Sequence, residues 1–350
     1  MVAIYSKKNK MVINNYLKNH LSASIYIVFL LLLLPRFSQS QVMPMDIDLK
    51  GLEYPFPVKY LRLDIQKQQY QMAYMDLEPA KSNGKAIVLL HGKNFSGAYW
   101  KQTAEALLEA GYRVVMPDQI GFGKSSKPKW LQYSFQQLAT NTKTLLDTLG
   151  IETVVVLGHS MGGMMAVRFT LMFPETVSKL VLENPIGLED YKLKVPYQTV
   201  DELYHKELKQ TAESIKKYQF TYYYDNKWKP EYDEWLNLTA GWTLSKDYPI
   251  IAWNNALTTD MIITQPVVYE LSNIKTPTLL IIGQRDRTAL GKDLVSPEVK
   301  ETMGNYPELG RHTKAKIPDS ELVEMEGIGH LPHIESFDRF IKPLLLFLNK

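Results

Sequence analysis

A glycine-rich segment near the middle of the chain constrains the fold more than any other feature. Residues Gly158–Gly163 read GHSMGG, and they follow a short apolar run at 154–157 and precede a helical pattern at 161–173. The spacing G-x-S-x-G between a strand and a helix is typical of a sharp turn that presents a serine hydroxyl above a sheet edge. Glycines are needed there because side chains would clash with their neighbours. We therefore expect Ser160 to be a nucleophile; the alternative is a strand-to-helix turn with an incidental serine.

Short apolar runs alternate with helical patterns along most of the chain, which predicts an α/β fold. Such an alternation implies a mostly parallel, twisted sheet flanked by helices on both faces. An antiparallel hairpin is expected at one sheet edge. The hairpin is predicted at 60–65 and 71–76, further strands at 86–90, 112–116, 154–157, 177–182, 278–282 and 322–325, and helices at 98–110, 135–149, 161–173 and 337–348.

The pattern changes between residues 185 and 272, where the sequence becomes polar, helical and rich in tyrosine and tryptophan. We interpret 185–272 as a helical cap inserted into a core formed by 41–184 and 273–350. These aromatic residues could line a pocket or form the interior of the cap. A second stretch, 290–318, is predicted to be irregular.

The first forty residues have the layout of a secretory signal. Lysines cluster between positions 7 and 18, an apolar run extends from Ile25 to Leu34, and small residues stand at positions 38 and 40. A run of this length is too short for a membrane span, which needs about 20 residues. We expect cleavage before Gln41 and export to the periplasm or the extracellular space. The alternative is an uncleaved membrane anchor that starts near Leu17.

Charge and cysteine content exclude several classes of function. The chain carries a formal charge of +3, but residues 1–40 contain five basic residues and no acidic ones, which leaves −2 for the rest. Nothing in this balance favours a nucleic acid partner. The absence of cysteine excludes disulfides, thiolate metal sites and a cysteine nucleophile. We expect a small-molecule substrate and no stable membrane span after cleavage; the oligomeric state is left open.

A serine nucleophile needs a base, and the base is expected to be a histidine. Among the seven histidines, His330 follows Gly329 just after the last predicted strand, where catalytic residues of α/β sheets gather. His333 lies in the same loop and is interpreted as a residue that supports the turn. The other histidines lie in the leader, after the strand 86–90, beside the serine, in the cap and in the 290–318 stretch.

The base in turn needs an acid to orient its ring. Asp286 directly follows the predicted strand 278–282, in the expected chain order of serine, acid and histidine. It could instead cap a following helix, or pair with the flanking arginines at the surface. Glu183 and Asp190, which follow the strand at 177–182, are the alternative acids.

Acyl transfer also needs backbone N–H donors for the negative charge that develops on the carbonyl oxygen. We expect one donor to be the Met161 amide and the other to be the Lys93 amide, in the loop after the strand 86–90. Asn94 is the alternative for the second donor. Aromatic residues near this loop indicate an apolar pocket, and the candidate substrate contacts are Asn94, Phe95, Trp100 and His159.

Taken together, five motifs resemble those of the α/β-hydrolase superfamily, in the same order. They are His91-Gly92, 117–125, Gly158–Gly163, 283–286 and Gly329-His330. The resemblance is greatest to the cap-bearing serine hydrolases, which include esterases and carbon–carbon bond hydrolases. It implies a triad of Ser160, Asp286 and His330, a helical cap over the site, and a structural role for Asp118 and Gly121. The mechanism expected for this triad needs no metal or cofactor. Haloalkane dehalogenases and epoxide hydrolases have Asp where this chain has Ser160, which disfavours both activities.

The resemblance and the triad predict a serine hydrolase that works through an acyl-enzyme, with a small, apolar carboxylic ester as the expected substrate. A carbon–carbon or amide bond hydrolase with the same triad is the first alternative. A member of the fold that binds a small molecule without hydrolysing it is the second, and an intact triad argues against it.

Overall fold

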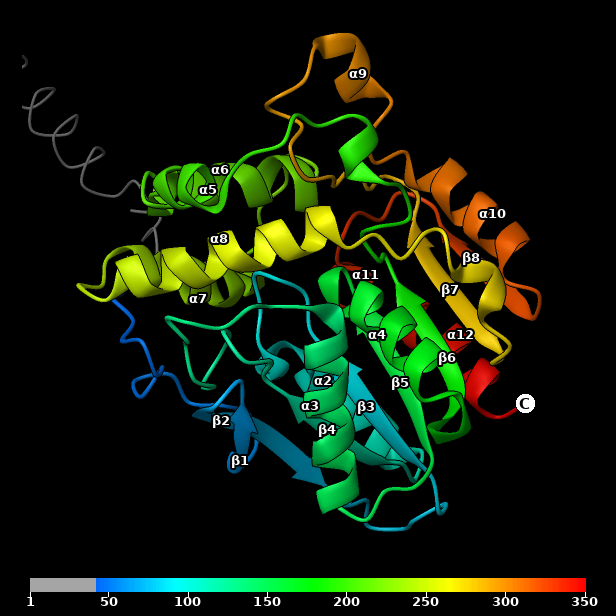
Figure 1. Cartoon of the computed structure of the whole chain (residues 1–350). Helices are drawn as coiled ribbons and strands as arrows, with labels where there is room; N and C mark the ends of the chain where they lie inside the picture. The colour runs from blue at the N-terminus through cyan, green and yellow to red at the C-terminus, as the bar shows by residue number, and fades with distance from the viewer. Residues whose placement is uncertain (1–41) are drawn as a thin grey trace, which may run out of the picture. The chain divides into compact units, whose positions relative to one another are not determined.

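The computed structural model describes residues 42–350, whose strands form a single eight-stranded sheet (Figure 1). The predicted signal segment and its cleavage site lie outside the described residues. The sheet order is β1-β2-β4-β3-β5-β6-β7-β8; β1 and β2 pair antiparallel, β2 also runs antiparallel to β4, and the remaining neighbours are parallel. This confirms the predicted mostly parallel sheet with an antiparallel hairpin at one edge. The strands are β1 Lys59–Ile65, β2 Gln68–Leu77, β3 Ala86–Leu90, β4 Arg113–Pro117, β5 Val154–His159, β6 Val177–Glu183, β7 Thr278–Gly283 and β8 Ser320–Met325.

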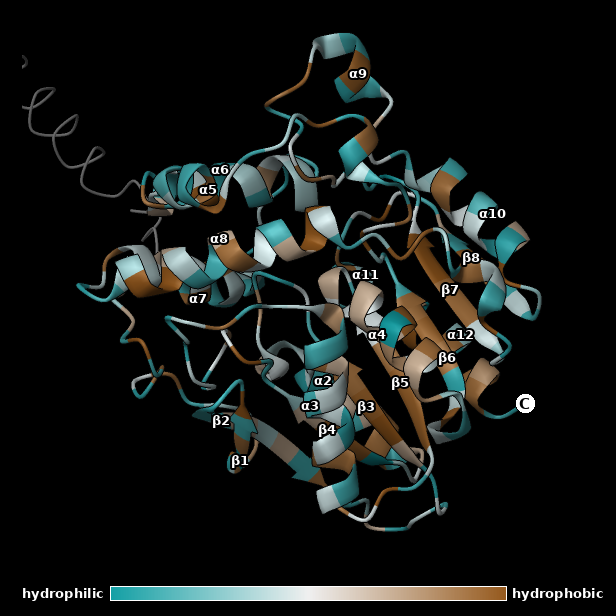
Figure 2. Cartoon of the chain, viewed as in Figure 1, coloured by the Kyte–Doolittle hydropathy of each residue, from teal (hydrophilic) through white to brown (hydrophobic). Residues whose placement is uncertain are grey.

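Helices cover both faces of the sheet, and the inner strands are therefore mostly apolar. Every residue of β3, β5 and β7 is buried, and these strands stand out as apolar in Figure 2. Alternate residues of β5 belong to different core clusters: Val154 and Val156 pack on the side of α3 and α4, Val155 and Leu157 on the side of α2 and α12. The covering helices are α2 Lys101–Glu109, α3 Phe135–Thr148, α4 Met161–Met172 and α12 Phe337–Leu348.

Four further α-helices between β6 and β7 form a layer over one end of the strands, where the sequence predicted a cap (Figure 1). Thr199 and Thr211 start the first two with capping boxes, in which side chain and backbone N–H groups are satisfied reciprocally. None of the helices within 42–350 is both long and apolar enough to cross a membrane. The cap helices are α5 Val200–Glu207, α6 Ala212–Tyr218, α7 Asp233–Thr243 and α8 Tyr248–Thr264.

The stretch 290–318, predicted to be irregular, contains two helices, α9 Pro297–Glu301 and α10 Tyr306–Lys316. Gly310 lies inside α10. A side chain at Gly310 would begin 3.1 Å from a side-chain atom of Ile282 in β7, so the glycine lets the helix approach the sheet. The prediction of an irregular stretch is therefore wrong for 297–301 and 306–316, where the chain is helical.

Asp118, at the end of β4, organises the loop that follows this strand. Its carboxylate accepts hydrogen bonds of 2.7 Å from the backbone N–H groups of Gly97 and Lys124 and from the Tyr54 hydroxyl. These contacts agree with the structural role that the sequence resemblance implied for Asp118.

The turn between β5 and α4 brings backbone segments unusually close together. A Cβ atom on Gly158 would lie 2.2 Å from the carbonyl oxygen of Gly162, and one on Gly162 would lie 2.1 Å from the carbonyl oxygen of Leu90 in β3. Any side chain at these positions would have to displace backbone atoms. The two glycines therefore allow α4 to start directly against the sheet.

We predict that Gly162→Ala lowers the free energy of unfolding by about 1–3 kcal/mol or more, because the added methyl group displaces β3. This clash outweighs the helix propensity gained from alanine, about 1 kcal/mol. Urea unfolding at constant pH measures the effect. Gly51→Ala is the matched control, since no atom lies within 4 Å of the added carbon. A Gly162→Ala protein as stable as the wild type would contradict the packing described here.

Candidate active site

Ser160 occupies a strained position in the turn. Its backbone angles are φ 55° and ψ −120°, in a region that residues with a side chain rarely adopt. Such a conformation costs about 1–3 kcal/mol and persists only where the surroundings impose it. The Ser160 N–H donates to the carbonyl of Glu183 at 3.2 Å, and its own carbonyl accepts from Gly163 at 2.9 Å and Ile186 at 3.2 Å. These contacts hold the hydroxyl in place.

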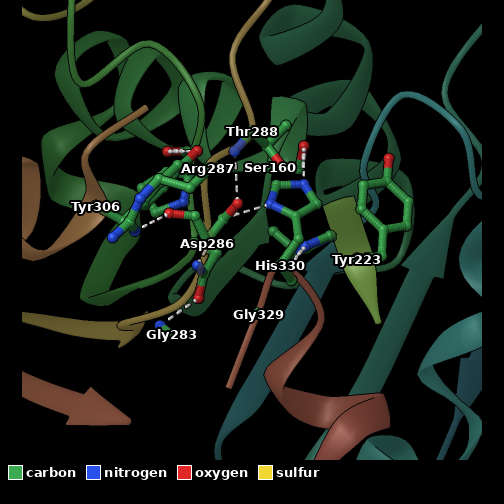
Figure 3. A network of polar contacts seen from close by, with 12 residues as sticks. Ser160, Tyr223, Gly283, Asp286, Arg287, Thr288, Tyr306, Gly329 and His330 are labelled. Atoms are coloured by element: carbon green, nitrogen blue, oxygen red, sulfur yellow. Dashed lines mark hydrogen bonds and ion pairs between the residues drawn. The ribbon is translucent and has the colours of Figure 1, made fainter. Parts of the chain in front are cut away.

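The side chains of Ser160, His330 and Asp286 meet in one chain of contacts (Figure 3). His330 Nε2 lies 3.0 Å from Ser160 Oγ, and His330 Nδ1 lies 2.7 Å from Asp286 Oδ2. The serine comes from the turn after β5, the acid from the loop after β7 and the histidine from the loop after β8. Parallel strands place these loops at the same sheet edge. The structure therefore brings together the three predicted residues.

Asp286 is fully buried, and its carboxylate accepts two further hydrogen bonds. Asn184 Nδ2 donates to Oδ2 at 2.8 Å, and the Thr288 N–H donates to Oδ1 at 2.7 Å. These donors hold the carboxylate in the position from which it orients the histidine ring. Sequence reasoning missed Asn184, whose only signal is its position directly after β6.

Neither arginine beside Asp286 uses its carboxylate. Arg285 forms an ion pair with Glu335, and Arg287 donates to the backbone carbonyl of Asp286 at 2.6 Å. The alternative that Asp286 forms a simple surface ion pair is therefore wrong. Its burial follows from its place in the first turn after β7, beneath the arriving loop of His330.

A second acid–histidine pair lies beneath the first. Glu183 Oε1 accepts from His333 Nδ1 at 2.8 Å and from the His333 backbone N–H at 2.9 Å, and both residues are buried. The His333 ring stacks on Trp100 at a centroid distance of 4.3 Å. Glu183 is therefore the partner of His333, and Asp286 is the partner of His330. The other alternative acid, Asp190, accepts from the Tyr269 hydroxyl at 2.8 Å.

A buried path of hydrogen bonds connects His330 with the loop after β3. The Gly92 N–H donates to the Tyr99 hydroxyl at 3.0 Å, the hydroxyl lies 3.0 Å from His159 Nδ1, and His159 Nε2 lies 2.7 Å from the His330 carbonyl. The contacts are satisfied together when His159 is neutral and carries its proton on Nε2. Burial lowers the pKa of His159 well below its usual value, and the neighbouring His330 and His333 add to this shift.

The two predicted oxyanion donors lie beside the serine. A Cβ atom on Gly92 would lie 3.1 Å from Ser160 Cβ, which places Lys93, the next residue, at the site. Within residues 42–350, neither the Met161 N–H nor the Lys93 N–H donates a hydrogen bond to the protein. Asn94 uses its side-chain N–H to donate to the Tyr223 hydroxyl at 3.2 Å.

A cavity of about 520 Å³ opens onto Ser160 between the core and the cap. Lys93 and Asn94 line it, as does Tyr223 of the cap, whose ring stacks on His330 at a centroid distance of 5.1 Å. Sequence reasoning placed Tyr223 among the cap aromatics without a specific role. Three predicted substrate contacts do not line the cavity, because their side chains are buried beneath the loops around it: Phe95, Trp100 and His159.

The neutral buried histidines predict a loss of stability in acid. Burial lowers the pKa of both His91 and His159, so below about pH 6.5 the unfolded chain takes up protons that the folded chain excludes. The unfolding free energy should then fall with pH by up to about 1.4 kcal/mol per pH unit for each histidine. In urea titrations from about pH 7.5 to 5.5, His159→Gln should flatten this slope, while His312→Gln, at an exposed position, should not. An identical slope in wild type and His159→Gln would contradict the burial of a neutral ring.

Comparison with known proteins identifies the family. Residues 85–337 match the family model described as the alpha/beta hydrolase fold. A probable hydrolytic enzyme from Pseudomonas aeruginosa has a crystal structure with a TM-score of 0.88 and 49% identity, covering 89% of this chain and 100% of that one. The 2-hydroxy-6-oxononadienedioate/2-hydroxy-6-oxononatrienedioate hydrolase of Paraburkholderia phymatum is 28% identical over 83% of this chain and 96% of its own length. Lipase 1 of Psychrobacter immobilis is 26% identical over 73% and 74%. These similar proteins are named as a hydrolytic enzyme, a hydrolase and a lipase. The chain belongs to the α/β-hydrolase family, whose model matches most of its length.

Proposed function

We propose that this hydrolase cleaves carboxylic esters through an acyl-enzyme on Ser160. The observation that carries the proposal is the aligned contact of Ser160 Oγ with His330 Nε2, 3.0 Å apart, beside a cavity open to that serine. The pattern of residues 1–40 supports export with cleavage before Gln41, and an uncleaved anchor remains the alternative.

The proposed reaction has two steps. His330 Nε2 takes the proton of Ser160 as the oxygen attacks the substrate carbonyl, and Asp286 stabilises the resulting imidazolium. The amides of Met161 and Lys93 stabilise the oxyanion. The imidazolium then protonates the leaving alcohol. Water, deprotonated by the same histidine, attacks the acyl-enzyme and releases the acid.

The lining of the cavity supports a substrate with an apolar body. Aromatic and aliphatic side chains of the cap form much of the wall, among them Tyr218, Tyr223 and Trp242. Other cap aromatics form its interior, as in the stacked pair of Tyr224 and Tyr232, whose ring centroids are 3.6 Å apart. Some cap aromatics therefore line the cavity, and others form the interior of the cap.

A carbon–carbon bond hydrolase is the second candidate, and one comparison favours it. The relative from Paraburkholderia phymatum is named a hydrolase of 2-hydroxy-6-oxononadienedioate, a compound with a ketone and no ester. The same serine can attack a ketone carbonyl, with the same histidine as base and the same amides as oxyanion donors. A direct comparison of aryl esters with this dienedioate separates the two candidates. We expect the larger kcat/KM for the esters; faster turnover of the dienedioate would favour the second candidate.

The triad assignment predicts how three variants behave. Ser160→Ala and His330→Ala should each lower kcat for an aryl ester by about 10⁴-fold or more, because each removes the nucleophile or its base. Asp286→Asn should lower kcat by about 10³- to 10⁴-fold, since the amide favours the wrong histidine tautomer.

The measurement is steady-state hydrolysis of short aryl esters, with circular dichroism to show that each variant is folded. His312→Ala is the matched control, because His312 is exposed on α10 and should keep wild-type activity. A folded Ser160→Ala protein with wild-type activity would refute the assignment of the nucleophile.

A further inference from the structure

The cavity beside Ser160 is positively charged, although the protein around it is not. Residues 42–350 carry a formal charge of −2, once the five basic residues of the leader are subtracted from +3. The cavity lining carries five basic residues and only two acidic ones, Glu207 and Asp293. The basic residues are Lys93, Lys206, Arg287, Lys292 and Lys300. A cleft lined by one sign of charge attracts ligands of the opposite sign.

Three of these basic side chains already have hydrogen-bond acceptors in the protein. Lys206 pairs with Asp293 at 2.6 Å, Arg287 donates to the carbonyl oxygens of Gln284 and Asp286, and Lys292 donates to the carbonyl of Arg287 at 2.7 Å. Lys300 is exposed, so water solvates its charge. Lys93 remains as the basic group whose charge is least satisfied by its surroundings.

Lys93 combines a mostly covered side chain with a weak partner. Its side chain is only 15% exposed, and Glu207 Oε1 at the end of α5 lies 3.8 Å from Nζ, beyond hydrogen-bond distance. Within residues 42–350, Nζ of Lys93 forms no hydrogen bond. Burial lowers the pKa of Lys93, and Glu207 opposes this shift only in part. An ammonium in a partly enclosed cavity loses part of its hydration, and an anion in the cavity would supply the acceptors that it lacks in the protein.

We propose that the substrate carries a carboxylate at a distance from the reacting carbonyl, and that the Lys93 ammonium binds it. This inference rests on the proposed function, because it concerns the specificity of the same site. Lys93 directly follows Gly92, which is in contact range of Ser160, and its side chain reaches across to the cap. The position of the ammonium selects the end of the substrate that does not react. A single ammonium suits one carboxylate rather than a phosphate dianion.

Glu207 then acts as a competitor for the ammonium while the cavity is empty. Its other acceptor contact is the Asn255 side chain, at 3.3 Å. Substrate binding would exchange the 3.8 Å ion pair for charge-assisted hydrogen bonds to the substrate. The competing explanation is that the pair of Lys93 and Glu207 simply holds the cap on the core. The two explanations predict opposite effects of removing the Glu207 charge.

The test compares two esters that differ only in one charge: the para-nitrophenyl monoester of adipic acid and the same compound methylated on its free carboxyl. The readout is the ratio of their kcat/KM values, anionic over neutral, corrected for uncatalysed hydrolysis. We expect a ratio above one for the wild type, and a fall of about 10- to 100-fold in Lys93→Met, as expected for one charge-assisted hydrogen bond. Lys93→Arg should keep most of the preference. Glu207→Gln should raise the ratio.

Lys206→Met is the matched control, since it removes a cavity lysine whose charge Asp293 already neutralises. Its ratio should stay within about two-fold of the wild type, a difference well under 1 kcal/mol. Equal kcat/KM for both esters in the wild type, or a ratio that Lys93→Met leaves unchanged, overturns the proposal. A lower ratio in Glu207→Gln also overturns it, in favour of the cap-holding role. If Ser160→Ala hydrolyses both esters as fast as the wild type, the proposed function itself fails, and this inference fails with it.

Discussion

The turn that carries Ser160 is the constraint on which the site depends. The serine has a positive φ of 55°, and α4 begins so close to β3 that only glycine fits at position 162. The turn orients the hydroxyl toward the loop after β8, where His330 arrives within 3.0 Å. A relaxed turn would lower the cost of this backbone but would move the hydroxyl away from its base. The strain is offset by the buried sheet on which the turn is built.

The two buried acid–histidine pairs show how similar chemistry can have different consequences. Asp286 contacts His330, which in turn contacts a serine that faces a cavity. Glu183 contacts His333, whose ring stacks on Trp100 instead. The difference lies in where each loop turns after its strand. The neutral His159 connects the first pair with the oxyanion loop, since it binds the His330 carbonyl and, through Tyr99, the loop that carries the proposed oxyanion donor. The base and the oxyanion loop therefore share one rigid support.

The sequence alone predicted the sheet, its edge hairpin and the convergence of the three triad residues. These follow from local signals: apolar runs bounded by turns, and a glycine pattern with one geometric solution. Contacts between distant segments, such as Asn184 with Asp286, have no local signal and were missed. The substrate contacts predicted at Phe95, Trp100 and His159 failed because an aromatic residue near a site looks the same in sequence whether it lines the cavity or supports it. Helices α9 and α10 were also missed, since the stretch 290–318 was predicted to be irregular.

The most direct test of this account is the position of a covalent adduct. A fluorophosphonate reacts with a serine that a histidine base activates, and peptide mass spectrometry locates the phosphonylated residue. We expect one adduct, on Ser160, and a rate of labelling that falls by orders of magnitude when His330 is replaced by alanine. A folded wild-type protein that stays unlabelled, or an adduct on another serine, would contradict the central claim that His330 activates Ser160.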